Sequence, residues 1–235
     1  MKIQYLLLLI ICCSGLSLFS QSKGYKGGFQ FKPMLGSGVF SNDAISDKTD
    51  SVVIAIKQEF GYSFGMTIRK EFTSVLAVET GLRFTQRNYT ANIDSVFSGY
   101  TSNLNYRMIG YEIPFKAMVR LKGSDNSYFN VALGGQLDLY PSDVSTYNYE
   151  WKMELIRKSW VSGSFLANVG WEIHPVNKGT FYFGLAYNQP FTSPFTALFG
   201  GINDSYAAMS IPQNGTFFSL DFRYYFEDKN DTPRR

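Results

Sequence analysis

The chain has 235 residues, a formal net charge of +3 at pH 7 and an aromatic content of 17%. So small a net charge gives no argument for nucleic acid as a partner, and the length suits one all-β domain. The many aromatic residues and the 21 glycines favour strands, turns and membrane interfaces.

The first segment in chain order is a predicted secretory signal peptide over residues 1–20. Lys2 gives a basic start, residues 5–13 form an apolar run, and small and polar residues lead to Ser20. Cleavage is expected before Gln21. Both cysteines, Cys12 and Cys13, would leave with this segment, so we expect no disulfide, cysteine metal site or cysteine nucleophile after it. No later stretch holds eighteen consecutive apolar residues, so a membrane location has to rest on strands.

Residues 21–226 are predicted to form one β-barrel. Apolar residues occupy every second position of the stretch 111–121, and Glu112, Lys116 and Arg120 lie between them. This alternation is typical of a strand with one apolar and one charged face. It recurs along the chain and predicts eight strands, over 27–40, 58–69, 73–89, 111–121, 128–140, 161–173, 180–188 and 216–226.

The connections between these strands alternate in length. Long loops are expected over 41–57, 90–103, 141–160 and 189–214, and short turns near 70–71, 123–126 and 174–179. Short turns of outer-membrane barrels face the periplasm, and long loops face outside. The sequence therefore predicts an all-β fold, an eight-stranded antiparallel up-and-down transmembrane β-barrel in a bacterial outer membrane. Both mature termini would be periplasmic, with 227–235 as a charged periplasmic tail. Alternation within 147–155 also predicts a hairpin beyond the membrane.

A soluble eight-stranded barrel or sandwich is the alternative, because it shows the same alternation with its apolar face turned inward. Aromatic residues near the strand ends, such as Trp171 and Phe181, and the aromatic end of the last strand at Phe226 favour the membrane. The soluble alternative predicts release from envelopes without detergent.

Three blocks of the sequence resemble the PorT-type (porin-family) outer-membrane β-barrel family. They are residues 79–84 (ETGLRF), 111–116 (YEIPFK) and 131–135 (VALGG), and the aromatic-Glu-Ile-Pro block at 111–114 is the most specific. The resemblance spans most of the mature chain. It implies an N-terminal signal and a small closed barrel, and it transfers no catalytic residue. The best-known members of this family take part in secretion across the outer membrane. The resemblance therefore allows a role for this chain in a larger envelope or secretion complex.

The charged face of the predicted strands is expected to line the lumen. The interior of an eight-stranded barrel is only wide enough for side chains, so we expect six acids and seven bases there, including Lys32 and Arg87, to nearly cancel. The predicted structural ion network consists of Glu59, Arg69, Glu79, Arg83, Glu112, Lys116, Arg120, Asp138, Glu172, Asp221 and Arg223. A narrow channel for water or small ions is the alternative, and the strand number excludes a larger pore.

The sequence predicts no enzyme, no cofactor and no metal. The single histidine, His174, lies beside Pro175 in a short turn, where we expect a solvated residue, and no phosphate-binding glycine loop or metal-ligand cluster is present. Aromatic residues of the long loops form a candidate contact surface: Tyr147, Tyr149, Trp151, Phe195 and Phe199. A place in the membrane girdle or packing against each other are equal alternatives. The expected role is structural or interactive, with outer-membrane lipid and an envelope protein as partners, and the oligomeric state stays open.

Overall fold

The computed structural model describes residues 24–35, 45–48, 52–95, 101–175, 179–201 and 209–226. The predicted signal peptide over 1–20 and the charged tail over 227–235 lie outside the described residues. Among the described residues, no helix is both long enough and apolar enough to cross a bilayer.

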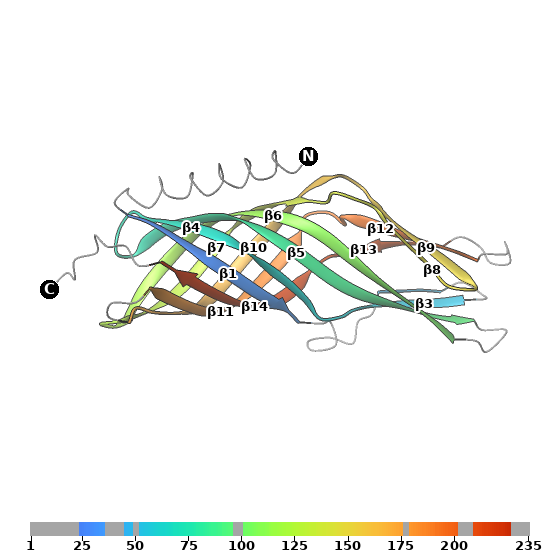
Figure 1. Ribbon diagram of the computed structural model, residues 1–235, viewed down its shortest axis with the longest axis horizontal. Helices are drawn as coiled ribbons and strands as arrows, with labels where there is room; N and C mark the ends of the chain where they lie inside the picture. Colours follow the sequence, from blue (N-terminus) through green and yellow to red (C-terminus); the bar gives the residue numbers. More distant parts are fainter. Residues whose placement is uncertain are drawn as a thin grey trace, which may run out of the picture.

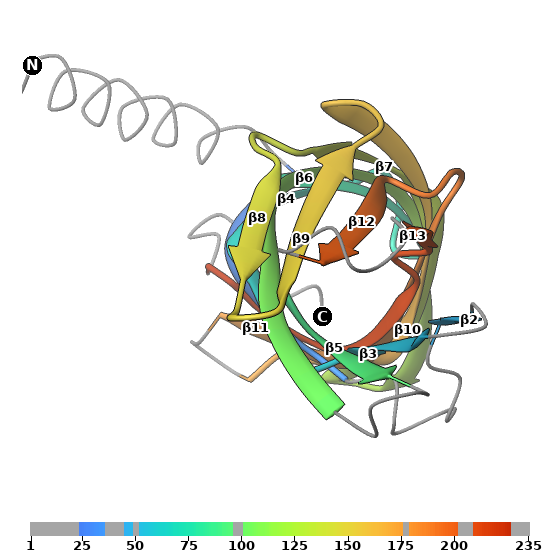
Figure 2. The same cartoon turned by 90° about the vertical axis from the view of Figure 1, so that its right-hand side faces the viewer.

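Eight strands of the described part close into a ring in which every neighbour is antiparallel. Each strand pairs with the next one around the ring, and the last pairs back with the first. In ring order they are β1 (Tyr25–Met34), β4 (Gly61–Glu71), β5 (Leu76–Ser95), β6 (Thr101–Ser124), β7 (Ser127–Leu139), β10 (Val161–Ile173), β11 (Thr180–Pro190) and β14 (Phe217–Tyr225). Figure 2 shows this ring from one end. The predicted all-β, eight-stranded antiparallel barrel is confirmed.

The predicted long loops contain further strands, and this corrects the prediction of loops over 41–57, 90–103, 141–160 and 189–214. β5 runs on to Ser95 and β6 begins at Thr101, so most of 90–103 is strand. The additional strands are β2 (Ile45–Lys48), β3 (Val52–Gln58), β8 (Val144–Tyr147), β9 (Trp151–Arg157), β12 (Phe195–Gly201) and β13 (Met209–Gln213). The predicted hairpin within 147–155 corresponds to the paired strands β8 and β9.

These additional strands form a two-layered extension at one end of the barrel, which we call the dome (Figure 1). One layer has the order β2-β3-β5-β6 and the other the order β13-β12-β9-β8. The space between the layers is filled by one apolar core: Val52, Ile54, Ile56, Tyr89, Ala91, Ile93, Leu104, Tyr106, Met108, Tyr140, Trp151, Met153, Leu155, Phe195, Ala197, Phe199, Met209 and Ile211. The short turns, the start of β1 and the end of β14 lie at the opposite end of the barrel (Figure 1).

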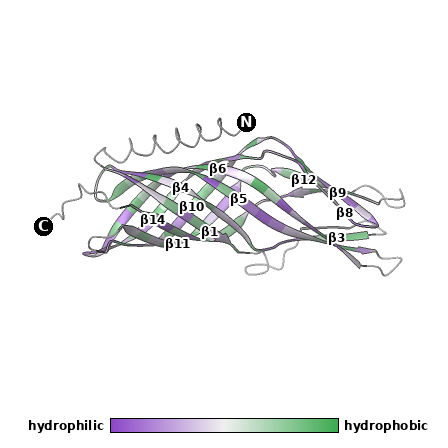
Figure 3. Cartoon of the chain, viewed as in Figure 1, coloured by the Kyte–Doolittle hydropathy of each residue, from purple (hydrophilic) through white to green (hydrophobic). Residues whose placement is uncertain are grey.

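The direction of the hydrophobic alternation reverses where the barrel meets the dome. In the barrel part of β5, Leu82 faces outward and Glu79 inward, whereas in the dome Asn92 faces outward and Ile93 inward. β6 has 24 residues and at roughly 3.3 Å per residue is far longer than a lipid-facing band of about 25 Å requires. Figure 3 shows both kinds of residue along these strands. The outward face of β5 changes from apolar to polar between Phe84 and Asn88. Outward apolar residues suit lipid, and outward polar residues suit water.

Candidate functional site: the filled lumen

The barrel interior holds ten of the residues predicted for the lumen, each at most 4% exposed: Arg69, Glu79, Arg83, Glu112, Lys116, Arg120, Asp138, Glu172, Asp221 and Arg223. Glu59 is a correction. Its side chain is 44% exposed and pairs with Lys57 at 3.5 Å. The reason is that the second predicted strand contains a break, since β3 ends at Gln58 and β4 begins at Gly61, which leaves Glu59 between them.

The Glu79 carboxylate lies at the centre of this network. Its Oε1 pairs with Lys116 Nζ at 2.6 Å, and its Oε2 pairs with Arg223 Nη1 at 2.9 Å and Arg69 Nη2 at 3.5 Å. The Tyr225 hydroxyl also donates to Oε2, while the Arg69 guanidinium lies over the Tyr225 ring at 4.0 Å from its centroid. Three cations therefore share one buried carboxylate, and this arrangement offsets the cost of removing each charge from water.

A second centre, Glu172, lies nearer the short-turn end. Its carboxylate accepts hydrogen bonds from Arg69 Nη1 at 2.5 Å, Arg120 Nη2 at 2.9 Å and Asn130 Nδ2 at 2.8 Å. His174 Nε2 lies 2.6 Å from Glu172 Oε1, and the histidine side chain is only 24% exposed. The prediction of a solvated turn residue is therefore wrong, because register brings this turn over the mouth of the lumen, where Glu172 offers it a partner.

The network continues toward the dome through Glu112 and Asp221. Arg83 Nη2 pairs with Glu112 at 2.8 Å and Arg87 Nη2 does so at 3.4 Å. Arg83 Nη1 donates to Gln30 Oε1 at 3.1 Å, and Gln30 Nε2 donates to Asp221 Oδ1 at 2.5 Å. The amide side chain of Gln30 on β1 thus connects an ion pair of β5 with a charged residue of β14.

Sequence reasoning missed the inward aromatic rings of the lumen. Arg223 lies over the Tyr182 ring at 4.2 Å, and Arg87 lies over the Phe217 ring at 4.4 Å. Cation–π contacts of this kind stabilise guanidinium groups that are removed from water. The signal was available, because Phe217 and Tyr225 share the strand parity of Asp221 and Arg223.

The lumen is more basic than the sequence suggests. With Glu59 outside, five acids and eight bases are buried in the described residues, Lys26 and Lys32 among the bases. Lys32 has no carboxylate within 4.0 Å in the described part of the chain, and its Nζ lies 5.9 Å from the Phe217 ring centroid. Glu71, a partly buried acid, pairs with Lys26 at 3.3 Å and with Arg120 at 2.8 Å. With it included, the bases still outnumber the acids by two, so the predicted near cancellation is corrected to a small excess of bases.

Aromatic packing closes the lumen where the dome begins. The Tyr89 and Tyr106 rings stack at 5.3 Å, and Tyr140 contacts Phe195 edge to face at 4.7 Å. Burial raises the pKa of the Tyr106 hydroxyl, which donates a hydrogen bond to Gln213 Oε1 at 3.3 Å. Dry apolar packing thus follows the charged network along the barrel axis.

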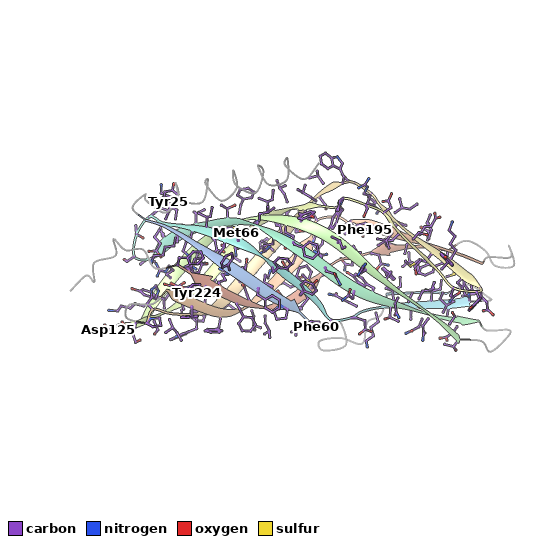
Figure 4. The ribbon with its side chains drawn as sticks, viewed as in Figure 1. Tyr25, Phe60, Met66, Asp125, Phe195 and Tyr224 are labelled. Atoms are coloured by element: carbon purple, nitrogen blue, oxygen red, sulfur yellow. The ribbon has the colours of Figure 1, made fainter. Side chains whose placement is uncertain are left out.

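The predicted loop contact surface divides into two groups. Tyr147 and Tyr149 are exposed, with 76% and 99% of their surface free. Trp151, Phe195 and Phe199 are at most 2% exposed inside the dome core, so the prediction that these three form an exposed surface is wrong. They occupy the inward positions of β9 and β12, where the alternation of a strand turns every second residue toward the core. Figure 4 shows Phe195 at the dome end.

Comparison with known proteins supports this geometry. No protein-family model matches the chain, and no curated protein matches its sequence. The crystal structure of the outer membrane protein OprG from Pseudomonas aeruginosa matches with a TM-score of 0.53 at 12% identity, over 86% of this chain and 94% of that chain. This chain has the fold of a bacterial outer-membrane β-barrel.

Two further structures of outer-membrane barrels are similar at lower scores. The outer membrane protease OmpT from Escherichia coli matches with a TM-score of 0.33 at 10% identity, over 86% of this chain and 91% of that chain. The β domain of the Bordetella autotransporter BrkA matches with a TM-score of 0.38 at 11% identity, over 87% of this chain and 99% of that chain.

The outer surface of the barrel is apolar. Large side chains such as Phe31, Leu82, Phe115, Leu133 and Leu185 are about half exposed on its strands. No group of three or more His, Cys, Asp or Glu residues in the described ranges is arranged to hold a metal ion.

Proposed function

We propose that the protein is a non-enzymatic integral outer-membrane barrel that serves the cell envelope as a structural or interaction protein. The observation that carries this proposal is the double filling of the interior, by an ion network in the barrel and by an apolar core in the dome. An interior of this kind favours rigidity over transport, because moving a solute through it would break buried ion pairs such as Arg83–Glu112.

The finer assignment to the PorT-type family is part of the same proposal. The three blocks that carry the resemblance lie side by side on β5, β6 and β7. Glu79 faces Lys116 and Arg83 faces Glu112 across β5 and β6, while Gly134 of β7 faces Lys116. A Cβ at Gly134 would lie 2.0 Å from the Phe115 carbonyl oxygen, so glycine is required there. The blocks thus describe one cross-strand patch with a structural role, and a place in a larger envelope or secretion complex is the role such a family implies.

Conductance in planar bilayers tests the filled lumen. We expect the purified full chain to give no steady current, and a steady current would overturn the proposal. The double variant Arg83→Ala with Glu112→Ala serves as a comparison. It removes both partners of a buried ion pair, whose charged groups lie 2.8 Å apart. If that pair helps to block the lumen, the variant conducts more often than the natural chain does.

The candidate interaction surface is reduced to Tyr147 and Tyr149 at the tip of the β8–β9 hairpin. Exposed tyrosines are common anchors of protein interfaces, and Tyr149 lies entirely in solvent. The variant Tyr147→Ala with Tyr149→Ala should lose envelope proteins that co-purify with the natural chain after cross-linking in intact cells. The control is Phe191→Ala, an exposed aromatic residue away from this hairpin. Equal recovery from both variants would contradict this surface.

A narrow channel for water or small ions is the second candidate, and one observation favours it. A cavity of about 10 Å³ is lined by Thr85, Arg87, Glu112, Asp138 and Tyr140, among others. Among the described residues the Tyr140 hydroxyl has no hydrogen-bond partner, and a space of this size holds roughly one water. The excess of buried bases would favour anions. Rapid osmotic swelling of proteoliposomes would support this candidate over the plug.

A further inference from the structure

A row of aromatic residues crosses the lipid-facing side of the barrel. The row follows direct register partners over six neighbouring strands, from β11 through β14, β1, β4 and β5 to β6. Its members are Phe183, Phe222, Phe31, Phe64, Phe84 and Tyr111. Neighbouring rings lie 5.7 Å apart for Phe183–Phe222 and 5.4 Å apart for Phe64–Phe84. Such distances allow direct ring contact.

A second row runs beside the first, one outward position closer to the short turns. It contains Phe181, Tyr224, Phe29, Met66 and Leu82; Figure 4 labels Met66 and Tyr224. Between the rows lies a groove of about 430 Å³, lined by seven aromatic side chains of β1, β4, β11 and β14 together with Gln30, Gly65, Tyr182 and Arg223. The large rings form the walls, because residues between the rows turn their side chains into the lumen.

The first row climbs across the membrane, and the groove occupies its part on β11, β14, β1 and β4. Phe183 lies near the short-turn end, since β11 begins at Thr180, whereas Tyr111 lies far from the turn end of β6 at Ser124. Strands of a barrel are tilted by about 40°, so a row of register partners rises as it passes around the wall. The upper end of the first row therefore reaches the membrane boundary below the dome.

A polar surface begins where the rows end. On the outward face of β5 and β6 the register partners are Asn88 with Arg107, Thr90 with Asn105, and Asn92 with Asn103. Thr90 Oγ1 donates to Asn105 Oδ1 at 2.9 Å. Asparagine is unfavourable in strands, yet four of these six positions hold it. Its amide both donates and accepts hydrogen bonds without a charge, which suits a ligand rich in hydroxyl groups. We call these six residues the amide ladder.

Tyr62 connects the groove to the amide ladder. Its ring lies 6.4 Å from Phe64, which lines the groove, and its hydroxyl donates to Gln86 Oε1 at 3.4 Å. Gln86 Nε2 in turn donates to Asn88 Oδ1 at 3.1 Å, at the start of the ladder. A ligand that covers both surfaces needs a linear apolar part and a polar, hydroxyl-rich head.

We propose that this surface binds a glycolipid of the outer leaflet, with an acyl chain in the aromatic groove and the sugar headgroup on the amide ladder. The proposal rests on the membrane location proposed above and on the expectation that the long connections, which form the dome, face outside. Continuity with the lipid-facing wall argues for a membrane lipid over a soluble partner. The near absence of charge on the ladder, where Arg107 is the one ionisable residue, argues for sugar hydroxyls over a purely ionic headgroup.

Native mass spectrometry of the detergent-purified full chain tests this. The probes are lipopolysaccharide, phosphatidylethanolamine and a lipid-free oligosaccharide prepared from the same lipopolysaccharide. We expect lipopolysaccharide to be retained about tenfold more strongly than the other two, a difference of about 1.4 kcal/mol. Asn103→Ala with Asn105→Ala should remove this preference and leave phospholipid retention unchanged. Phe31→Ala with Phe64→Ala should lower retention of both lipids.

The control is Leu133→Ala, an outward residue of β7, which neither row includes. Heat-modifiable gel mobility confirms that each variant is folded. Equal retention of both lipids would overturn the headgroup part, and equal losses in Leu133→Ala and the groove variant would overturn the groove. Equally strong binding of the free oligosaccharide would mean that the acyl chain contributes nothing, and it would overturn the lipid site in favour of a site for soluble sugars. None of these outcomes depends on conductance, so a failure here and a failure of the filled lumen are separate results.

Discussion

Single residues inside the barrel carry charges that several partners hold at once. Glu79 illustrates this, because Lys116, Arg223 and Arg69 all share its carboxylate at full burial. We predict that Glu79→Gln destabilises the barrel by about 3–5 kcal/mol, since the substitution keeps the shape but leaves buried cations without their counter-charge. The measurement is urea unfolding in detergent, followed by loss of heat-modifiable gel mobility.

A matched control lies on the dome surface. Glu154 pairs with Lys152 at 2.6 Å, but both side chains are about half exposed. Glu154→Gln should change the free energy of unfolding by about 0–1 kcal/mol, as exposed ion pairs do. Similar effects of the two substitutions would mean that the lumen charges are hydrated, contrary to a filled interior.

Tyr106 predicts how the dome responds to alkaline pH. Burial raises the pKa of its hydroxyl above the usual value, which is about 10. Above that pH the unfolded chain loses the proton while the folded dome keeps it. The contribution of Tyr106 to the free energy of unfolding is therefore fully present below about pH 10 and is lost as the pH rises. The protection factors of the β6 amides, which correct for the base-catalysed intrinsic rate of exchange, should therefore fall above about pH 10. Tyr106→Phe should reduce this dependence, whereas Tyr149→Phe at an exposed site should not.

At the scale of elements, β5 and β6 each serve two environments. Their barrel parts expose apolar residues and bury charges, and their dome parts do the reverse. The same backbone pairing continues through both parts. Continuous pairing satisfies the backbone hydrogen bonds on either side of the boundary, so only the side chains have to change. A barrel strand can in this way continue into a dome with a polar surface without a linker.

We expect that the dome can be destabilised while the barrel stays folded. Leu155 is fully buried between the layers, and Leu155→Ala should cost about 2–5 kcal/mol through lost burial and a cavity. Hydrogen exchange should become faster in β9 and β12, while the barrel keeps its heat-modifiable mobility. Ile156→Ala, at an outward and 41% exposed position of the same strand, should change little. Loss of the whole barrel in Leu155→Ala would contradict a separable dome.

The elements also show which signals the sequence contained. Residues 161–173 coincide with β10, because a clean alternation bounded by turns leaves one register. The polar outward residues of the dome strands favour a prediction of loops, although Ala91 and Ile93 continue the alternation of β5. Glu59 was assigned to the lumen because alternation alone does not reveal a break between two strands.

At the scale of the whole molecule, the short turns and the dome lie at opposite ends of the barrel (Figure 1). We predict that the dome faces outside, because long connections of outer-membrane barrels do so. Tyr149→Cys should react with a membrane-impermeant maleimide on intact cells, while Asp125→Cys in the β6–β7 turn should react only after the outer membrane is permeabilised. The reverse pattern would place the dome in the periplasm and the termini outside the cell.

By itself, the sequence determined the closed eight-stranded barrel, its ring order and the parity of most lumen charges. Period-two alternation and short turns act locally, so neighbouring residues carry that information. Only the tertiary structure decided that Trp151, Phe195 and Phe199 lie in a dome core, that His174 reaches Glu172, and that bases exceed acids in the lumen. These contacts join strands that are far apart in the sequence, and their partners depend on barrel closure, which sets the register and shear between strands.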